Sequence, residues 1–247
     1  MPADAAPWFV ALLLVTAIAA GATASVVGFG IGSLLTPVFA ARYGTDAAIA
    51  AVALPHFAGG LLRGWRLRAS VDRSLLLRFG LLSAAGGLAG ALGFAQLAPL
   101  ALTRTLGALL LLTATAGLTG WSSRWHPRGP LVWLLGALSG FCGGMVGNQG
   151  GLRAAALSAF GLAPAAFVAT STVIGVLVDV ARTPVYLTSA GSRLEAMWPL
   201  VGLAGAGVLV GTLLGERLLF GLAPRRFRIV VSAAVGLLGL WFLFGAA

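Results

Sequence analysis

Long apolar segments separated by short polar stretches make up most of the chain, and two glycine-rich stretches interrupt that pattern. Residues 21–32 read GATASVVGFGIG, and residues 140–153 read GFCGGMVGNQGGLR. The second stretch is the more polar, because two amides and an arginine accompany its glycines. We interpret the two stretches as the tips of two re-entrant hairpins that face each other.

The same stretches define an internal repeat. Their glycines align at one constant offset, which recurs approximately through the rest of both halves. We therefore predict two transmembrane repeats, residues 1–120 and 131–247, joined by a cytoplasmic linker at 121–130 into one integrated transport domain. The aligned glycine pairs are Gly28 with Gly147 and Gly32 with Gly151.

The remaining apolar segments predict spanning helices in an all-α membrane bundle. Most are long enough to cross a hydrocarbon core of about 30 Å, which needs roughly 20 residues, and none alternates as barrel strands do. Each half should hold one hairpin and three spanning helices, and this odd number of crossings inverts the second half. The first half is expected to have hairpin arms at 8–24 and 33–41 and helices at 47–62, 79–97 and 105–120. The second half is expected to have a hairpin at 131–160 and helices at 165–181, 197–219 and 229–244.

Composition supports a membrane location. Hydrophobic residues make up 59% of the sequence and charged residues only 9%, whereas soluble domains carry roughly 25% charged residues. Every basic residue is an arginine, and most lie between apolar segments, where orienting charges belong. No nucleic-acid partner is therefore expected despite the net charge of +10. The single cysteine, Cys142, excludes an internal disulfide.

The arginine positions agree with inversion. If the linker is cytoplasmic, matching loops of the two halves carry opposite charge bias, and both chain termini should lie outside. The arginines assigned to the inner side are Arg63, Arg66, Arg68, Arg73, Arg78, Arg124, Arg128, Arg217, Arg225, Arg226 and Arg228. Those assigned to the outer side are Arg42, Arg104, Arg182 and Arg193.

Three segments, together with the plan of two halves, resemble a known family. They read GFGIGSLLTP, GNQGGLRAAAL and AAFVATSTVIG, and with them the chain is similar to the sulfite exporter TauE/SafE family of bacterial membrane proteins. The resemblance covers nearly the whole chain. It implies a transporter that moves sulfite or related organosulfur anions across the inner membrane. The first glycine turn keeps the family pattern, including Pro37, whereas the second lacks an equivalent proline.

The second turn offers the chemistry of an anion site. A half-helix that starts near Gly151 directs unpaired backbone amides and the positive end of its dipole toward the turn. Asn148 and Gln149 add amide donors, and Arg153 adds a planar fork suited to sulfite, sulfonate or carboxylate oxygens. Glycines let a ligand approach the backbone. The glycines assigned to the substrate site are Gly28, Gly32, Gly147 and Gly151.

Arg153 and His56 each admit two interpretations. A cation at membrane depth costs at least about 2.5 to 3.5 kcal/mol, so a bound anion would compensate Arg153. Alternatively, Arg153 extends to a surface or pairs with a carboxylate. His56 lies near the midplane, where it would donate to the substrate or carry a coupling proton, or else pack as a neutral residue between helices.

Other polar residues of the spans also have an alternative. Ser171 and Thr172, beside Thr170, would bind the anion, although back-bonding to helix carbonyls or small-residue packing is the preferred interpretation. Asp179 is a candidate for proton coupling, but a local pair with Arg182 is preferred. Glycines spaced by four at Gly86 and Gly90, and at Gly207, Gly211 and Gly215, indicate helix-packing faces.

We therefore expect a non-enzymatic transporter that moves a small anion by alternating access at a midplane site. The family resemblance implies that it is an exporter. Its expected partners are the small anionic substrate and the lipid bilayer, and the sequence leaves a homodimer open. Neither a metal nor another cofactor is expected, because no phosphate-loop motif or ligand cluster appears. The alternatives are an anion channel, a non-transporting scaffold and, remotely, an intramembrane serine protease using Ser33 and His56.

Overall fold

The computed structural model describes residues 6–94, 96–120, 128–148, 150–158, 160–218 and 224–245, and most of these residues are helical, with no strand among them. This result confirms the all-α prediction. Within the described residues, six helices are long and apolar enough to cross a membrane. They are Pro7–Val26, Thr45–Arg66, Arg73–Phe94, Pro99–Thr119, Pro164–Gly191 and Trp198–Gly215. The chain is therefore a multi-pass membrane protein.

Five of these six spans match predicted spanning helices, and two assignments differ. The helix Pro7–Val26, which we assigned to a hairpin arm, is itself long enough to cross. The predicted crossing at 229–244 falls in α12 (Pro224–Leu240) and the π-helix η3 (Trp241–Gly245), of which Val235–Gly245 counts only as a shorter apolar helix.

The first glycine turn breaks the chain between two helices. Helix α1 (Pro7–Val27) ends at Gly28, whose φ of 85° is left-handed, and α2 (Ile31–Tyr43) begins after Gly30, whose φ is 132°. Glycine is the residue that adopts such angles without steric strain. Only Gly44 then separates α2 from α3 (Thr45–Arg66), so the loop expected around residues 42–46 is a single residue.

The second glycine turn repeats this arrangement. Helix α8 (Pro130–Val146) ends at Gly147, with a φ of 74°, and is followed by α9 (Gly150–Ser158) and α10 (Pro164–Glu195). The predicted interruption before Gly151 is confirmed. The sequence offset between Gly28 and Gly147 also relates other boundaries of the two halves. It relates the end of α1 to that of α8, the start of α2 to that of α9, and the start of α3 to that of α10.

The other helices complete the bundle. The segment Arg73–Phe94 runs through α4 (Arg73–Leu75), the π-helix η2 (Leu76–Gly80) and α5 (Leu81–Phe94), after the short 3-10 helix η1 (Arg68–Ser70). Helices α6 (Pro99–Thr119) and α11 (Trp198–Leu218) follow in their halves. Most of the predicted linker, residues 121–127, lies outside the described part of the chain.

Two predicted loop positions are wrong. Helix α10 continues past Arg182 and Pro184 to Glu195, although we expected a loop at 182–195. Likewise, Arg63 lies inside α3 rather than in a basic connection. Both arginines are buried, so neither contributes to the loop charge bias. Each guanidinium has polar partners inside the bundle, which allows the helix to continue where the sequence indicated a polar end.

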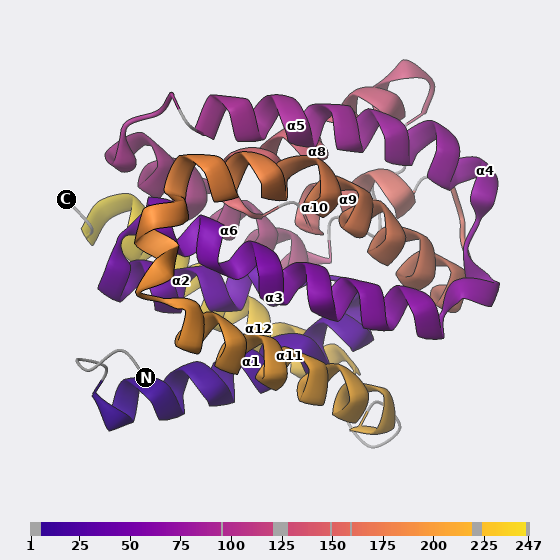
Figure 1. Cartoon of the computed structure of the whole chain (residues 1–247). Helices are drawn as coiled ribbons and strands as arrows, with labels where there is room; N and C mark the ends of the chain where they lie inside the picture. The colour runs from indigo at the N-terminus through magenta and orange to yellow at the C-terminus, as the bar shows by residue number, and fades with distance from the viewer. Residues whose placement is uncertain are drawn as a thin grey trace.

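Helices α3 and α10 form the centre of the bundle (Figure 1). In this view both helices lie between α5, at the top, and α1 with α11, at the bottom. Helix α3 packs on α10, α2 and α11, while α10 packs on α3 and α5. The outer pairs are α1 with α11 and α5 with α8. Polar residues on the facing sides of α3 and α10 are therefore enclosed by other helices.

Glycines allow the outer pairs to approach closely. A Cβ at Gly86 or Gly90 of α5 would stand about 2 Å from a carbonyl oxygen of α8, at 2.1 and 2.0 Å, respectively. A Cβ at Gly211 of α11 would stand 2.0 Å from the Ile18 carbonyl oxygen of α1. The predicted helix-packing role of these glycines is confirmed.

We predict that Gly211→Ala destabilises the protein by about 1–3 kcal/mol, because the added methyl group forces two backbones apart. Thermal unfolding of the detergent-solubilised protein measures this loss. Gly205→Ala on the same helix is the matched control, since nothing lies within 4 Å of its Cβ position. Equal stability of the two variants would contradict the packing role.

Candidate functional site

The two glycine turns lie directly against each other. A Cβ at Gly32 would stand 2.3 Å from the carbonyl oxygen of Gly147, so only a residue without a side chain permits this approach. Beside them, Ser33 Oγ donates to Asn148 Oδ1 at 3.2 Å, and both side chains are buried. The structure thus brings the two turns together. Gln149 lies outside the described residues.

Arg153 is buried at the start of α9, with 2% of its surface exposed. Its Nε donates to Ser171 Oγ of α10 at 3.0 Å. Its Nη1 is buried without a hydrogen-bond partner, and no carboxylate of the described residues pairs with it. Among the described residues, Arg153 is therefore buried and has no ion pair, and its contact with the substrate stays a prediction.

A glycine on α10 makes room for this guanidinium. A Cβ at Gly175 would stand 3.1 Å from Arg153 Nη1 and 3.5 Å from Nη2. The first glycine turn also adjoins this region, because a Cβ at Gly28 would stand 3.9 Å from Ser171 Cβ. The side chain of Arg153 thus extends from the second hairpin across α10, close to the first hairpin.

Two other polar atoms of the hairpins lack partners among the described residues. Asn148 Nδ2 is a buried donor in the second turn, and Thr36 Oγ1 is a buried hydroxyl on α2. Thr36 lies beside Gly147, whose Cβ position is 3.8 Å from its hydroxyl. Buried polar groups are nearly always hydrogen-bonded, so both atoms are available to a ligand that offers an acceptor.

The hydroxyls near the start of α10 bond to other segments. Thr172 Oγ1 accepts from Arg63 Nε of α3 at 2.8 Å, and Thr170 Oγ1 accepts from the backbone nitrogen of Asp72 at 3.0 Å. Ser171 accepts from the buried arginine of α9. Within the described residues these bonds hold α10 to α3, α9 and the start of α4. The roles of Ser171 and Thr172 in anion binding stay a prediction.

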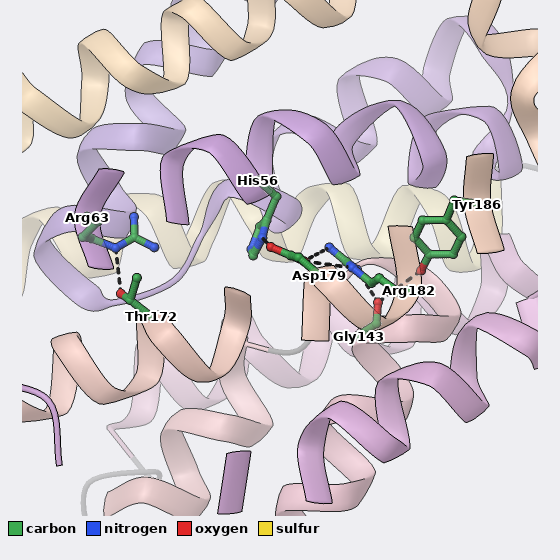
Figure 2. Close-up of polar contacts among 7 residues, drawn as sticks. All are labelled: His56, Arg63, Gly143, Thr172, Asp179, Arg182 and Tyr186. Atoms are coloured by element: carbon green, nitrogen blue, oxygen red, sulfur yellow. Dashed lines mark hydrogen bonds and ion pairs between the residues drawn. The ribbon is translucent and has the colours of Figure 1, made fainter. Parts of the chain in front are cut away.

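His56, Asp179 and Arg182 form one buried chain between α3 and α10 (Figure 2). His56 Nδ1 lies 2.6 Å from Asp179 Oδ2, while Arg182 approaches Asp179 Oδ1 with Nε at 2.9 Å and Nη2 at 2.8 Å. The predicted pair of Asp179 with Arg182 is confirmed. His56, which we expected either at the substrate or packed between helices, is held by this carboxylate.

The chain continues to the last turn of α8. Arg182 Nη1 and Tyr186 Oη both donate to the Gly143 carbonyl oxygen, the latter at 3.4 Å (Figure 2). Tyr186 Oη also donates to the Gly144 carbonyl oxygen, just before the break at Gly147. The sequence analysis missed the roles of Arg63 and Tyr186 and the bond of Arg182 to Gly143. One signal was available for the arginines, because Arg63 and Arg182 align at the same offset as the repeat glycines.

The buried charged side chains of the described residues lie on α3, α9 and α10. Three buried guanidiniums, those of Arg63, Arg153 and Arg182, are accompanied by one buried carboxylate, Asp179. Both oxygens of that carboxylate already have partners. Arginine remains protonated in proteins, and an uncompensated cation in apolar surroundings is costly. The surroundings of Arg153, which has no ion pair among the described residues, are therefore chemically suited to an added anion.

The comparisons with known proteins give one result. Residues 13–242 match the family model described as Sulfite exporter TauE/SafE. The chain belongs to this family. Membership indicates a membrane transporter of sulfur anions, which agrees with the excess of buried donors and positive charge. No curated protein and no solved structure gives a match.

The protease alternative requires a dyad of Ser33 and His56. The structure instead bonds Ser33 to Asn148 and the His56 ring to Asp179. Neither contact is the serine–histidine bond that activates a nucleophile.

We predict that Asp179→Asn destabilises the protein by about 3–5 kcal/mol, because it leaves the buried Arg182 without its counter-ion. The measurement is the free energy of unfolding in detergent. Asp46→Asn is the matched control, since Asp46 pairs with Arg193 near the surface. The exposed fraction is 20% for the Asp46 side chain and 63% for the Arg193 side chain. It should change stability by only about 0.2–1 kcal/mol. A small effect at Asp179 would contradict the structural importance of the chain.

Proposed function

We propose that the protein is an alternating-access transporter for sulfite or a small organosulfonate, bound where the two glycine turns meet. The observation that carries this proposal is the Arg153 guanidinium, which is buried without a counter-ion or an Nη1 partner among the described residues. Because the side chain is enclosed rather than open to a pore, we favour a carrier with an occluded site over a channel.

The donors around this position suit an oxyanion. A guanidinium offers a fork of N–H groups that matches pairs of oxygen atoms, and Asn148 Nδ2 adds a neutral donor. The start of α9 contributes backbone amides that its own helix leaves unpaired. A sulfite or sulfonate group presents three acceptor oxygens and no donor, so it would satisfy these groups together.

An inverted repeat would place this site at the bilayer midplane. Two features support the inversion: the helix boundaries recur at one offset, and α1 packs on α11 as α8 packs on α5. Helices α2 and α9 have 13 and 9 residues, so at 1.5 Å per residue each is too short to cross. We assign both to hairpins that return to the side from which they entered, as in transporters with broken helices.

The orientation follows from the same proposal. A cytoplasmic linker in a bacterial inner membrane would place both termini outside. Alternating access would then consist of movement of one repeat against the other around the meeting point of the turns. Export is the direction that the family description suggests.

We predict that Arg153→Gln abolishes anion binding. A ligand at about 100 times its dissociation constant adds roughly 2.7 kcal/mol to stability, so the thermal shift produced by sulfite or ethanesulfonate should disappear in the variant. Arg193→Gln is the control, because that arginine is exposed and should leave the shift intact. A shift that persists in Arg153→Gln would refute the proposed site.

We also predict that Gly175→Ala weakens anion binding about tenfold, which corresponds to about 1.4 kcal/mol. The added Cβ would crowd the Arg153 guanidinium without removing its charge. Gly191→Ala on the same helix is the control, since nothing lies within 4 Å of its Cβ position. Titration of both purified variants with ethanesulfonate measures the difference. Unchanged affinity in Gly175→Ala would show that the anion does not bind at this guanidinium.

A further inference from the structure

We propose that His56 binds a proton whenever a doubly charged anion binds at Arg153, so that the two are carried together. This inference rests on the proposed function and adds the coupled ion to it. Its basis is the contact of His56 with Asp179, whose other oxygen is held by Arg182. The proposal assigns proton binding to His56 and gives Asp179 a positioning role.

The contact determines which ring atom takes the proton. An ionised carboxylate bound by arginine only accepts hydrogen bonds, so Nδ1 of His56 carries a hydrogen and donates it to Asp179. The coupled proton therefore binds at Nε2. Exposure agrees, because the His56 side chain keeps 10% of its surface exposed whereas that of Asp179 keeps none. Histidine is also the side chain that ordinarily titrates near neutral pH.

The surrounding charges make the two binding events cooperative. Asp179 and Arg182 cancel each other, so a protonated His56 adds one positive charge beside the uncompensated Arg153. Without an anion these like charges repel. A dianion supplies two negative charges, which Arg153 and protonated His56 together neutralise. By linkage, each ligand then raises the affinity for the other by the same factor.

The charged groups that act on His56 are Asp179 and Arg182 of α10 and Arg153 of α9. Further along α10 are Tyr186, Arg193 and Glu195. On its own helix, Asp46 lies in the first turn, and Arg63 and Arg66 lie in the last turn, where Arg63 bonds to Thr172. The other packed elements carry their titratable residues as follows: Arg42 and Tyr43 at the far end of α2, Arg104 exposed on α6, Arg68 on η1, and Glu216 and Arg217 of α11, whose side chains lie outside the described part.

The same chain connects the proton to the second glycine turn. Arg182 bonds both to Asp179 and to the Gly143 carbonyl oxygen at the end of α8. When His56 becomes positive, it competes with Arg182 for the shared carboxylate. The hold on α8 next to Gly147 then changes with the protonation of His56. This connection lets the proton influence the hairpin that carries Arg153.

Calorimetric titration of the purified protein tests the inference. The probes are thiosulfate, which stays a dianion across pH 6–8, and ethanesulfonate, which stays a monoanion. Titrations run in Bis-Tris and in imidazole, because their ionisation enthalpies differ and neither carries a competing sulfonate. Binding of thiosulfate should be accompanied by uptake of close to one proton by the protein. The affinity for thiosulfate should fall up to tenfold per pH unit as the pH rises. Ethanesulfonate should take up less.

The variant His56→Gln keeps an N–H donor for Asp179 but binds no proton. It should still bind thiosulfate, with no proton uptake and with an affinity that no longer depends on pH. Should this variant fold poorly, His56→Asn provides the same comparison. In liposomes, a pH gradient with the interior acidic should alter thiosulfate flux in the wild type but not in the variant.

The outcomes separate this inference from the proposed function. Thiosulfate binding without proton uptake, or equal uptake in the wild type and His56→Gln, would overturn the role of His56 while leaving the anion site intact. Absence of binding by both probes would overturn the proposed function and this inference with it. Uptake that disappears only in the His56 variants would support the assignment.

Discussion

Charge compensation inside an apolar bundle is the constraint on which the rest of this structure depends. Water cannot solvate a cation there, so each guanidinium needs partners within the protein or from a ligand. Asp179 compensates Arg182 and orients His56, and the Gly143 carbonyl oxygen completes the surroundings of Arg182. Arg153 has one hydroxyl partner and no carboxylate among the described residues. The imbalance that remains is what makes an anion ligand physically reasonable.

Local patterns in the sequence predict much of the fold. Hydrophobic length predicts five of the candidate spans, and the glycines predict both helix breaks, because positive φ and close approach are local demands. The loop assigned to residues 182–195 is wrong for a tertiary reason. A buried arginine looks like the end of a span until its partners are known, and the carbonyl that accepts from Arg182 belongs to another helix.

The site is less predictable than the fold, and sequence distance explains why. The pairing of Asp179 with Arg182 follows from helical spacing, whereas His56 and Asp179 are separated by 123 positions. Arg63 donates to Thr172 across 109 positions, and the local hydrogen-bonding preferences of threonine do not predict such a contact. The family match supplies the class of cargo, and the structure supplies the groups that would hold it.

Glycines occupy the repeat positions that match His56 and Asp179, and this has a consequence for how the two halves build one site. At the repeat offset, His56 corresponds to Gly175 and Asp179 corresponds to Gly60. The pair of residues that would mirror the histidine–carboxylate contact is therefore a pair of glycines, and one of them leaves the space that Arg153 fills. The contact of His56 with Asp179 and the space for Arg153 thus both depend on the two halves carrying different residues at matching positions.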